Sequence, residues 1–149
     1  MTHDPGTILL VEDEEAHVEL TVRAIRKAGN ANRVDTVYDG EEALDYLFNR
    51  GKYADKNEYP TPDLVLLDLK LPGVDGIDVL KQIKEEPQLK KVPVVMLTTS
   101  ERAEDIELCY KHHANSYLTK PVGYKEFEEK IRSLDFYWMI LNKPPFGGQ

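Results

Sequence analysis

The chain has 149 residues, of which 27 are acidic and 19 basic, and its formal net charge is −8. This length suits one domain with a self-sufficient core, and a second domain of ordinary size does not fit beside it. Because nucleic-acid binders carry a basic surface, this acidic balance leads us to expect no DNA or RNA ligand.

Cysteine content and hydropathy narrow the class of protein further. Cys109 is the single cysteine, which excludes a disulfide framework and a cysteine-based zinc site, and we interpret it as a structural thiol. The sequence has no apolar run of about 18 residues, and its first residues have neither the basic nor the apolar part of a secretion signal. We therefore expect a cytoplasmic protein that does not contact membranes.

Short apolar runs alternate with amphipathic segments along the chain. The predicted strands are 8–11, 33–38, 64–67, 92–97 and 115–118. Apolar residues at helical spacing follow each run, over about 14–28, 43–48, 77–86, 103–113 and from 124 onward. The polar stretch 49–62 interrupts this pattern, and we interpret it as a long surface loop. The alternation predicts a doubly wound α/β fold, in one domain over 1–149 with a core from about 7 to 134.

Polar side chains stand at the ends of four predicted strands. Glu12 and Asp13 follow the first strand, Asp68 follows the third, Thr98 follows the apolar run of the fourth, and Lys120 comes just after the fifth. Because the carboxyl ends of parallel strands lie at one edge of a sheet, we expect these residues to converge. Three crowded carboxylates repel each other unless a cation is shared, and hard oxygen ligands suit Mg²⁺, with Mn²⁺ as a substitute.

A metal-bound carboxylate that faces a phosphoryl group can act as the nucleophile. We assign Asp68 this role, with Thr98 as hydroxyl donor and Lys120 as the ammonium partner of the transferring charge. Taken singly, these residues have plainer explanations. Asp68 precedes a Pro-Gly loop and suits a turn cap, while Glu12 and Asp13 are favourable acids at a helix N-terminus. Their coincidence at the strand ends favours the reactive site.

This set of residues resembles the response-regulator receiver domain of two-component signalling, over about 7–134. The matching residues are the acidic pair Glu12–Asp13, the phosphoacceptor Asp68, the switch hydroxyl Thr98, the switch aromatic Tyr117 and the lysine of Lys120–Pro121. The resemblance implies a flavodoxin-like (βα)5 three-layer sandwich with sheet order 2-1-3-4-5. It also implies Mg²⁺-dependent phosphoryl transfer from a sensor histidine kinase to Asp68 and self-dephosphorylation, in a signalling protein that is not an enzyme.

The resemblance implies further roles within the site. The backbone carbonyl of Lys70 completes the metal ligands, and Tyr117 turns inward when Thr98 moves toward the phosphoryl group. The peptide bond before Pro121 is expected to be cis. Glu12 stands where the family more often has aspartate, and we expect its longer side chain to reach the metal through water.

The C-terminal segment carries a second pattern. Apolar residues recur at alternating spacings of four and three at Phe127, Ile131, Leu134, Trp138 and Leu141. Other faces of the same predicted extended helix are also apolar, and the candidate interface residues are Phe136, Tyr137, Trp138, Met139 and Ile140. Such a segment fits a dimer or partner contact at 135–149, although it can also fold back onto its own core. It resembles stand-alone regulators of phytochrome-type kinases, which implies a homodimer.

Two other functions compete with a phosphorylated switch. A haloacid-dehalogenase-type phosphatase also uses a strand-end aspartate and Mg²⁺, but it needs an acid two residues later, where this chain has Lys70. A phosphorylation-independent interaction module predicts that site residues are lost, and here all of them are present.

Overall fold

The structure is a computed structural model that describes residues 6–27, 33–121 and 123–134. Its five strands are all parallel and form one sheet in the order β2-β1-β3-β4-β5. Their bounds are β1 Thr7–Val11, β2 Arg33–Val37, β3 Leu64–Leu67, β4 Val94–Thr98 and β5 Ser116–Thr119. The predicted α/β fold and strand order are confirmed.

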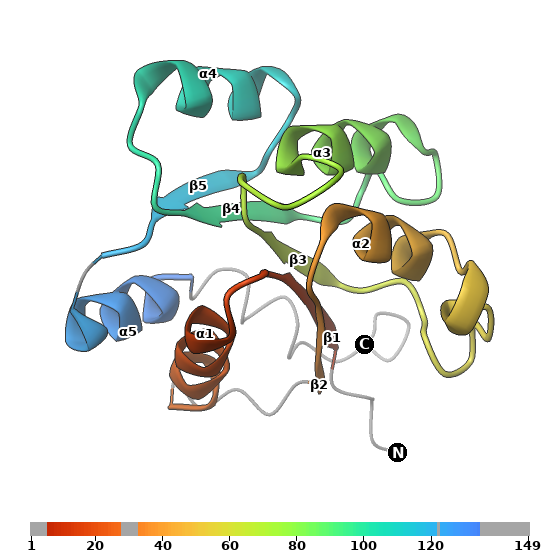
Figure 1. Cartoon of the computed structure of the whole chain (residues 1–149), viewed down its shortest axis with the longest axis horizontal. Helices are drawn as coiled ribbons and strands as arrows, with labels where there is room; N and C mark the ends of the chain where they lie inside the picture. Colours follow the sequence, from red (N-terminus) through yellow and green to blue (C-terminus); the bar gives the residue numbers. More distant parts are fainter. Residues whose placement is uncertain (1–5, 28–32, 122, 135–149) are drawn as a thin grey trace, which may run out of the picture.

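Helices cover both faces of the sheet (Figure 1). One face carries α1 (Glu15–Lys27) and α5 (Tyr124–Arg132). The other carries α2 (Gly40–Leu47), α3 (Gly76–Glu85) and α4 (Ala103–Lys111). This arrangement is the expected three-layer sandwich.

Apart from Thr7 and Thr98 at strand ends, β1, β3 and β4 are apolar, because both of their faces are covered. Every residue of β1, β3 and β4 is buried, whereas β5 at the sheet edge is only half-buried. Successive side chains of β1 enter opposite cores, with Ile8 on the side of α1 and α5 and Leu9 on the side of α2, α3 and α4. Because the strand side chains are anchored in both cores, the strands and the polar residues that follow them are held in fixed positions.

Two close backbone approaches hold the loop between β3 and α3. A Cβ added to Gly40 would lie 2.0 Å from the Val74 carbonyl oxygen, and one added to Gly76 would lie 2.3 Å from the Asp68 carbonyl oxygen. Overpacking of a well-packed site costs about 1–3 kcal/mol, so these contacts require glycine. The loop that carries Lys70 is therefore pinned at both ends, close to Asp68.

The segment between α2 and β3 is more ordered than the predicted surface loop. It contains a short 3₁₀ helix, η1 (Gly51–Tyr53), and buries Tyr53 against Tyr46 and Tyr59, with ring centroids 4.8–5.6 Å apart. The hydroxyls of Tyr46 and Tyr53 each donate a 2.6 Å hydrogen bond, to Asp35 and Glu42 respectively. These bonds satisfy the phenol groups, so a polar-looking segment can bury its rings.

Cys109 lies buried on α4, in accord with a structural thiol. Burial, together with the nearby Asp105 carboxylate, raises the pKa of the thiol to about 11. A thiol held neutral in this way is a poor nucleophile.

The last described helix, α5, ends at Arg132, and Leu134 beyond it is buried. The predicted helical extension over 135–149, with its candidate interface Phe136–Ile140, lies outside the described residues. Within the described part of the chain, no helix is long and apolar enough to cross a membrane.

Candidate functional site

The register of the central strands places two carboxylates side by side. Val11 of β1 pairs with Leu67 of β3, so the residues that follow them, Glu12 and Asp68, leave the sheet together. The Asp68 amide donates to the Val11 carbonyl at 3.1 Å, and the Glu12 amide donates to the Val37 carbonyl at 3.0 Å. Main-chain bonds thus fix both residues where their side chains are buried.

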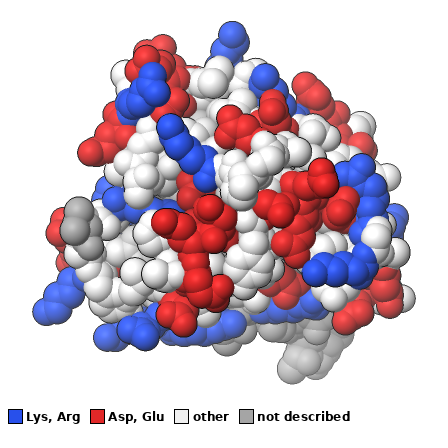
Figure 2. Space-filling model, in the orientation of Figure 1, with Lys and Arg blue, Asp and Glu red and all other residues white. Residues whose placement is uncertain are grey.

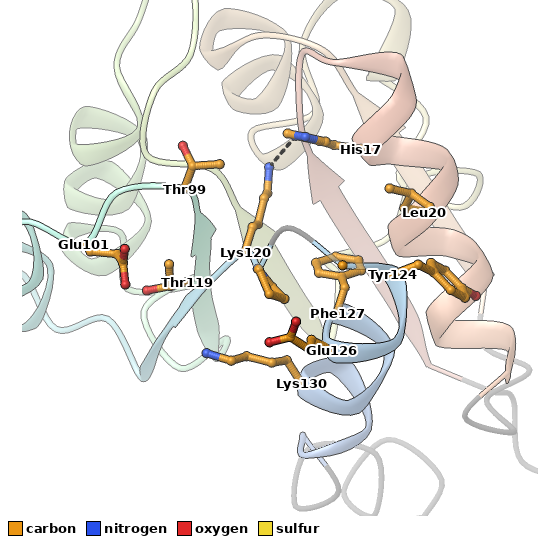
Figure 3. Close-up of a pocket in the computed structure, with 12 residues that line it drawn as sticks. His17, Leu20, Thr99, Glu101, Thr119, Lys120, Tyr124, Glu126, Phe127 and Lys130 are labelled. Carbon is orange, nitrogen blue, oxygen red and sulfur yellow. Dashed lines mark hydrogen bonds between the residues drawn. The ribbon is translucent and has the colours of Figure 1, made fainter.

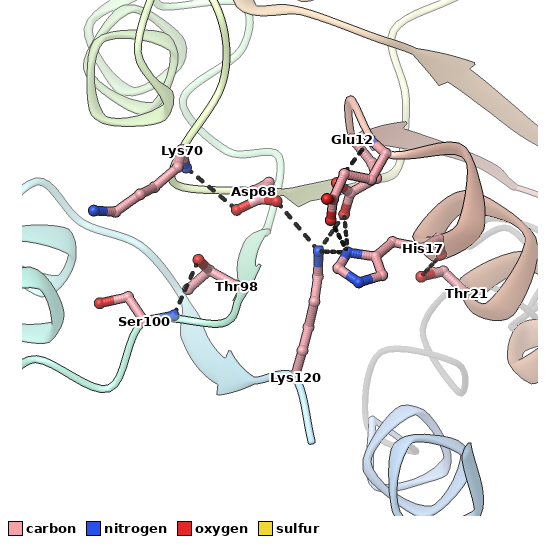
Figure 4. Close-up of polar contacts among 9 residues, drawn as sticks. Glu12, His17, Thr21, Asp68, Lys70, Thr98, Ser100 and Lys120 are labelled. Carbon is pink, nitrogen blue, oxygen red and sulfur yellow. Dashed lines mark hydrogen bonds and ion pairs between the residues drawn. The ribbon is translucent and has the colours of Figure 1, made fainter. Parts of the chain in front are cut away.

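Lys120 reaches the same place from β5. Its amide donates to the Thr98 carbonyl at 2.7 Å, which continues the pairing of β4 with β5 by one residue. Its side chain is only 5% exposed, and Nζ donates to Glu12 Oε1 and, at 3.2 Å, to Asp68 Oδ2 (Figure 4). The structure therefore brings Glu12, Asp68 and Lys120 into one buried cluster.

The carboxylates of this cluster form a set that fits a divalent cation. One oxygen from each of Glu12, Asp13 and Asp68 lies within 4.8 Å of the others, and Asp13 is exposed. Three carboxylates face one ammonium group here, which leaves an excess of negative charge that a hard cation compensates. The Lys70 amide donates to Asp68 Oδ1 at 3.2 Å, and the role of the Lys70 carbonyl as a ligand stays a prediction.

Burial of Glu12 alters its acidity. Glu12 is 1% exposed, and this burial raises the pKa of its carboxyl to about 7, against the opposing effect of Lys120 and with a further increase from Asp68. Near neutral pH, a proton therefore competes with any cation for this carboxylate.

The two residues predicted to act as a switch, Thr98 and Tyr117, both contact Ser100. Thr98 is fully buried, and its Oγ1 accepts a long 3.4 Å hydrogen bond from the Ser100 amide; Figure 4 draws no interaction between Thr98 and Asp68. The half-buried Tyr117 donates its hydroxyl to the Ser100 carbonyl at 2.8 Å. Ser100 Oγ in turn donates to Asp105 on α4 at 2.5 Å. In the sequence, the feature that points to Ser100 as a site residue is its place in the polar triplet 98–100 at the end of β4.

His17 is a site residue that the sequence pattern did not reveal. Its Nδ1 lies 3.1 Å from Lys120 Nζ and 2.9 Å from Glu14 Oε2. A single histidine on an amphipathic helix looks like a surface residue. The sequence feature that points to His17 is the start of α1 shortly after the acidic pair, which places the first turn of this helix at the same edge of the sheet.

A groove with a volume of about 660 Å³ lies beside Lys120 (Figure 3). Its lining comes from α1, the loop after β4 and α5, and includes His17, Leu20, Thr99, Glu101, Phe127 and Lys130. The groove combines apolar and charged groups, as protein-binding surfaces do.

Figure 2 shows acidic side chains gathered across the middle of the face that it draws, with Lys and Arg mostly toward the margins.

The peptide bond before Pro121 is trans, so the expectation of a cis bond there is wrong. A bond preceding proline prefers the trans form by about 0.5–1 kcal/mol, and the Lys120 side chain reaches the cluster without the cis form.

Comparison with known protein families decides the assignment. The model of the response regulator receiver domain matches residues 8–132, which include the whole cluster. The chain belongs to this family.

Known relatives of this receiver domain resemble it over most of their length. It is 42% identical to the probable methanogenesis regulatory protein FilR2 of Methanothrix harundinacea, over 95% of this chain and 89% of that protein. The crystal structure of the phosphorylated cyanobacterial phytochrome response regulator RcpA has a TM-score of 0.84 at 39% identity, covering 91% of this chain and 94% of its own. Mn²⁺-bound Rcp1 of Synechocystis has a TM-score of 0.83 at 36% identity, covering 95% of this chain and 98% of its own.

Family membership gives the protein a role in two-component signalling, and it favours a signalling protein over the phosphatase alternative. Phosphorylation on aspartate is typical of the family, and the cluster around Asp68 offers the residues for it. Solved structures in the family include one with a bound divalent metal, which agrees with the carboxylate set of this chain.

We predict that metal binding depends on pH through Glu12. A raised carboxyl pKa means that the metal-free site holds a proton below pH 7, which a cation must displace, whereas above pH 7 it binds the free carboxylate. The dissociation constant for Mn²⁺ should therefore fall about tenfold from about pH 6 to about pH 8. Titration followed by electron paramagnetic resonance of free Mn²⁺ measures it.

Glu12→Gln is the control for this prediction. The variant cannot take up the proton, so it should bind Mn²⁺ more weakly and with a nearly flat profile over the same range. An equally steep profile in Glu12→Gln would assign the proton to another group.

Proposed function

We propose that this receiver domain accepts a phosphoryl group on Asp68 from the phosphohistidine of a sensor kinase, in a Mg²⁺-dependent reaction, and signals through protein contacts. The observation that carries the proposal is the buried contact of Lys120 Nζ with Asp68 Oδ2 beside a set of three carboxylates. A buried ammonium and a cation-binding set at one carboxylate suit a transferring phosphate group.

The proposed ligands of the metal are Glu12, Asp13, Asp68 and the Lys70 carbonyl. When bound, the cation neutralises these carboxylates and offers open positions to phosphoryl oxygens. Both Glu12 oxygens already accept hydrogen bonds, from Lys120 Nζ and from the Glu14 amide at 3.2 Å. This engagement supports a water-mediated role for Glu12, with direct contacts from the aspartates.

In the transfer step, a carboxylate oxygen of Asp68 bonds to phosphorus as the phosphorus–nitrogen bond of the donor histidine breaks. Lys120 leaves Asp68 Oδ2 and pairs with the phosphoryl oxygens, because that oxygen loses negative charge in the acyl phosphate. Water later attacks the phosphorus, the bond from phosphorus to the Asp68 oxygen breaks, and inorganic phosphate leaves, which restores the carboxylate.

We propose that Thr98 and Tyr117 convert phosphorylation into a change of surface. Thr98 Oγ1 turns from the Ser100 amide to donate to the phosphoryl group. Tyr117 follows, because its hydroxyl is bonded to the Ser100 carbonyl of the same loop. Asp105 extends the effect to the N-terminal turn of α4. The result is a two-state element that the charge on Asp68 biases.

The proposed partner is a sensor histidine kinase of phytochrome type. Support comes from the likeness to RcpA, described as a phytochrome response regulator, at 39% identity. The groove beside Lys120 gives a protein segment access to the site. We further propose that the protein acts in the cytoplasm, where reducing conditions keep a lone thiol such as Cys109 free.

We propose that residues 1–149 act as a single receiver domain and as a homodimer. The apolar segment 135–149 would contribute the dimer contact, through Phe136–Ile140. Aromatic enrichment in this segment is typical of protein interfaces.

The test of the proposed reaction is phosphoryl uptake. With Mg²⁺ and either a phosphorylated histidine kinase or acetyl phosphate, the intact mass of the protein should rise by one phosphoryl group. Asp68→Asn should abolish this gain because the nucleophilic oxygen is lost, and chelation of the metal should abolish it too. Asp78→Asn, which changes an exposed acid on α3, is the matched control and should keep the gain. Equal uptake by Asp68→Asn would overturn the assignment.

Coupling to Tyr117 is tested with beryllofluoride, a phosphoryl mimic. In the wild type, its addition with Mg²⁺ should shift the Tyr117 ring resonances. Thr98→Ala removes the hydroxyl that turns toward the phosphoryl group, so this variant should lose the shift. The neighbouring Thr99 is exposed, and Thr99→Ala should keep it. A full shift in Thr98→Ala would show that Tyr117 responds by another route.

The dimer is tested by light scattering with and without beryllofluoride. We expect twice the mass of one chain in the activated state, and Trp138→Ala should shift the population to monomer. Leu108→Ala truncates an exposed apolar side chain on α4 and should leave the dimer intact. A monomer in both states, or dissociation by Leu108→Ala instead, would contradict the role of 135–149.

A further inference from the structure

The Lys120 ammonium group has three N–H donors and three partners among the described residues. Glu12 Oε1 is the first, Asp68 Oδ2 at 3.2 Å the second, and His17 Nδ1 at 3.1 Å the third. A buried ammonium needs all of its donors satisfied, since an unpaired one costs free energy. His17 is therefore part of how Lys120 is held (Figures 3 and 4).

The three partners of Lys120 differ in the other groups that they are proposed to bind. Glu12 and Asp68 belong to the carboxylate set for the metal, and Asp68 is also the proposed phosphoacceptor. In the proposed reaction, a cation would engage Asp68 directly and Glu12 through a bound water, and the phosphoryl group would then occupy an Asp68 oxygen. Each carboxylate oxygen that Lys120 contacts can therefore lose that contact. His17 comes from α1 and lies outside that set, so its lone pair stays available to Lys120 in each state.

We infer that His17 is a positioning residue, which keeps the Lys120 ammonium at the reaction site while the two carboxylates are engaged elsewhere. The role rests on the proposed function, because it needs a cation on the carboxylates and a phosphoryl group on Asp68. It requires the imidazole tautomer with its proton on Nε2, so that Nδ1 accepts the hydrogen bond.

Glu14 competes for the same nitrogen, at 2.9 Å from Nδ1. Its side chain is 62% exposed and can be solvated, whereas the Lys120 side chain is 5% exposed and has no such alternative. The buried donor therefore has the stronger claim on Nδ1. The same geometry disfavours a second metal on Glu12, Glu14 and His17, because the ammonium charge occupies that position.

Packing of α1 fixes the position of His17. Val18 and Ile25 on the same helix are buried in the core beneath the sheet. Thr21 Oγ1 donates to the His17 carbonyl at 2.7 Å, one turn along. The imidazole thus projects from a helix turn anchored on the core, which suits a residue that must hold another side chain in place.

Two substitutions at position 17 separate this role from simple packing. His17→Asn places an amide oxygen at the position of Nδ1 and keeps the acceptor, whereas His17→Leu places a methyl group there. His113→Asn is the control, because this exposed histidine has a left-handed backbone (φ 72°) that asparagine tolerates. Denaturant midpoints of all the variants establish that each is folded.

The first readout is the ¹H–¹⁵N signal of the Lys120 ammonium in the unphosphorylated protein. Without metal, the carboxylates hold the ammonium in every variant, and the signal should be present. With saturating Mg²⁺, it should persist in the wild type, His17→Asn and His113→Asn, and disappear through fast exchange in His17→Leu.

The second readout is phosphoryl uptake from acetyl phosphate at saturating Mg²⁺. We expect His17→Leu to be about tenfold slower than the wild type, and His17→Asn and His113→Asn to stay within about twofold. A Lys120 signal that persists in Mg²⁺-bound His17→Leu together with unchanged uptake would overturn the inference, as would equal losses in the Asn and Leu variants. Absence of uptake by the wild type would instead refute the proposed function, and the Lys120 signal would still test His17.

Discussion

The site depends on one buried ammonium group. Moving a charge out of water costs several kcal/mol per ion in proteins, and attraction between ions offsets this only when their geometry is good. Here the geometry comes from the sheet, since paired residues of β1 and β3 release Glu12 and Asp68 side by side and β5 delivers Lys120. Removal of one partner from such a buried pair typically destabilises a protein by about 3–5 kcal/mol, so the cluster is part of the fold as well as the candidate site. The cost of burial is visible at Glu12, whose carboxyl pKa is raised by its removal from water although Lys120 opposes the shift.

The hydrogen bonds around Ser100 support the proposed route from a charge on Asp68 to a distant surface. The bond from the Ser100 amide to Thr98 is long, at 3.4 Å, so Thr98 loses little when it turns toward a stronger acceptor. The bonds of Ser100 to Tyr117 and Asp105 are short, at 2.8 and 2.5 Å. A phosphoryl group brings about two negative charges, which is enough to compete for the Thr98 hydroxyl. In the proposed switch, the weak bond is therefore the one that breaks, while the strong ones make the loop, β5 and α4 move together.

The sequence predicted those parts of the structure that follow from periodicity and topology. The apolar run before Asp68 indicates a buried parallel strand. Because the carboxyl ends of parallel strands lie at one edge of a sheet, the sequence also predicts that Glu12, Asp68 and Lys120 converge. Contacts that depend on the rotation of a helix were not predictable: His17 meets Lys120 only because α1 packs with Val18 and Ile25 inward. The polar composition of segment 49–62 predicts a surface loop. The hydrogen bond from the buried Tyr53 to Glu42 of α2 depends on the three-dimensional packing and is not visible in the sequence.

Glu12 links the buried ammonium group to the start of α1. The side chain spans from Lys120 at one oxygen to the Glu14 amide at the other, and it stays 1% exposed. Glu12 therefore ties the ammonium to the first turn of α1, and His17 presents its acceptor from that turn. Both residues contact Lys120 from the side of the cluster away from Asp68 (Figure 4). In the proposed reaction, His17 keeps this contact when a cation engages Glu12, so the ammonium can exchange Asp68 for a phosphoryl oxygen without leaving its place.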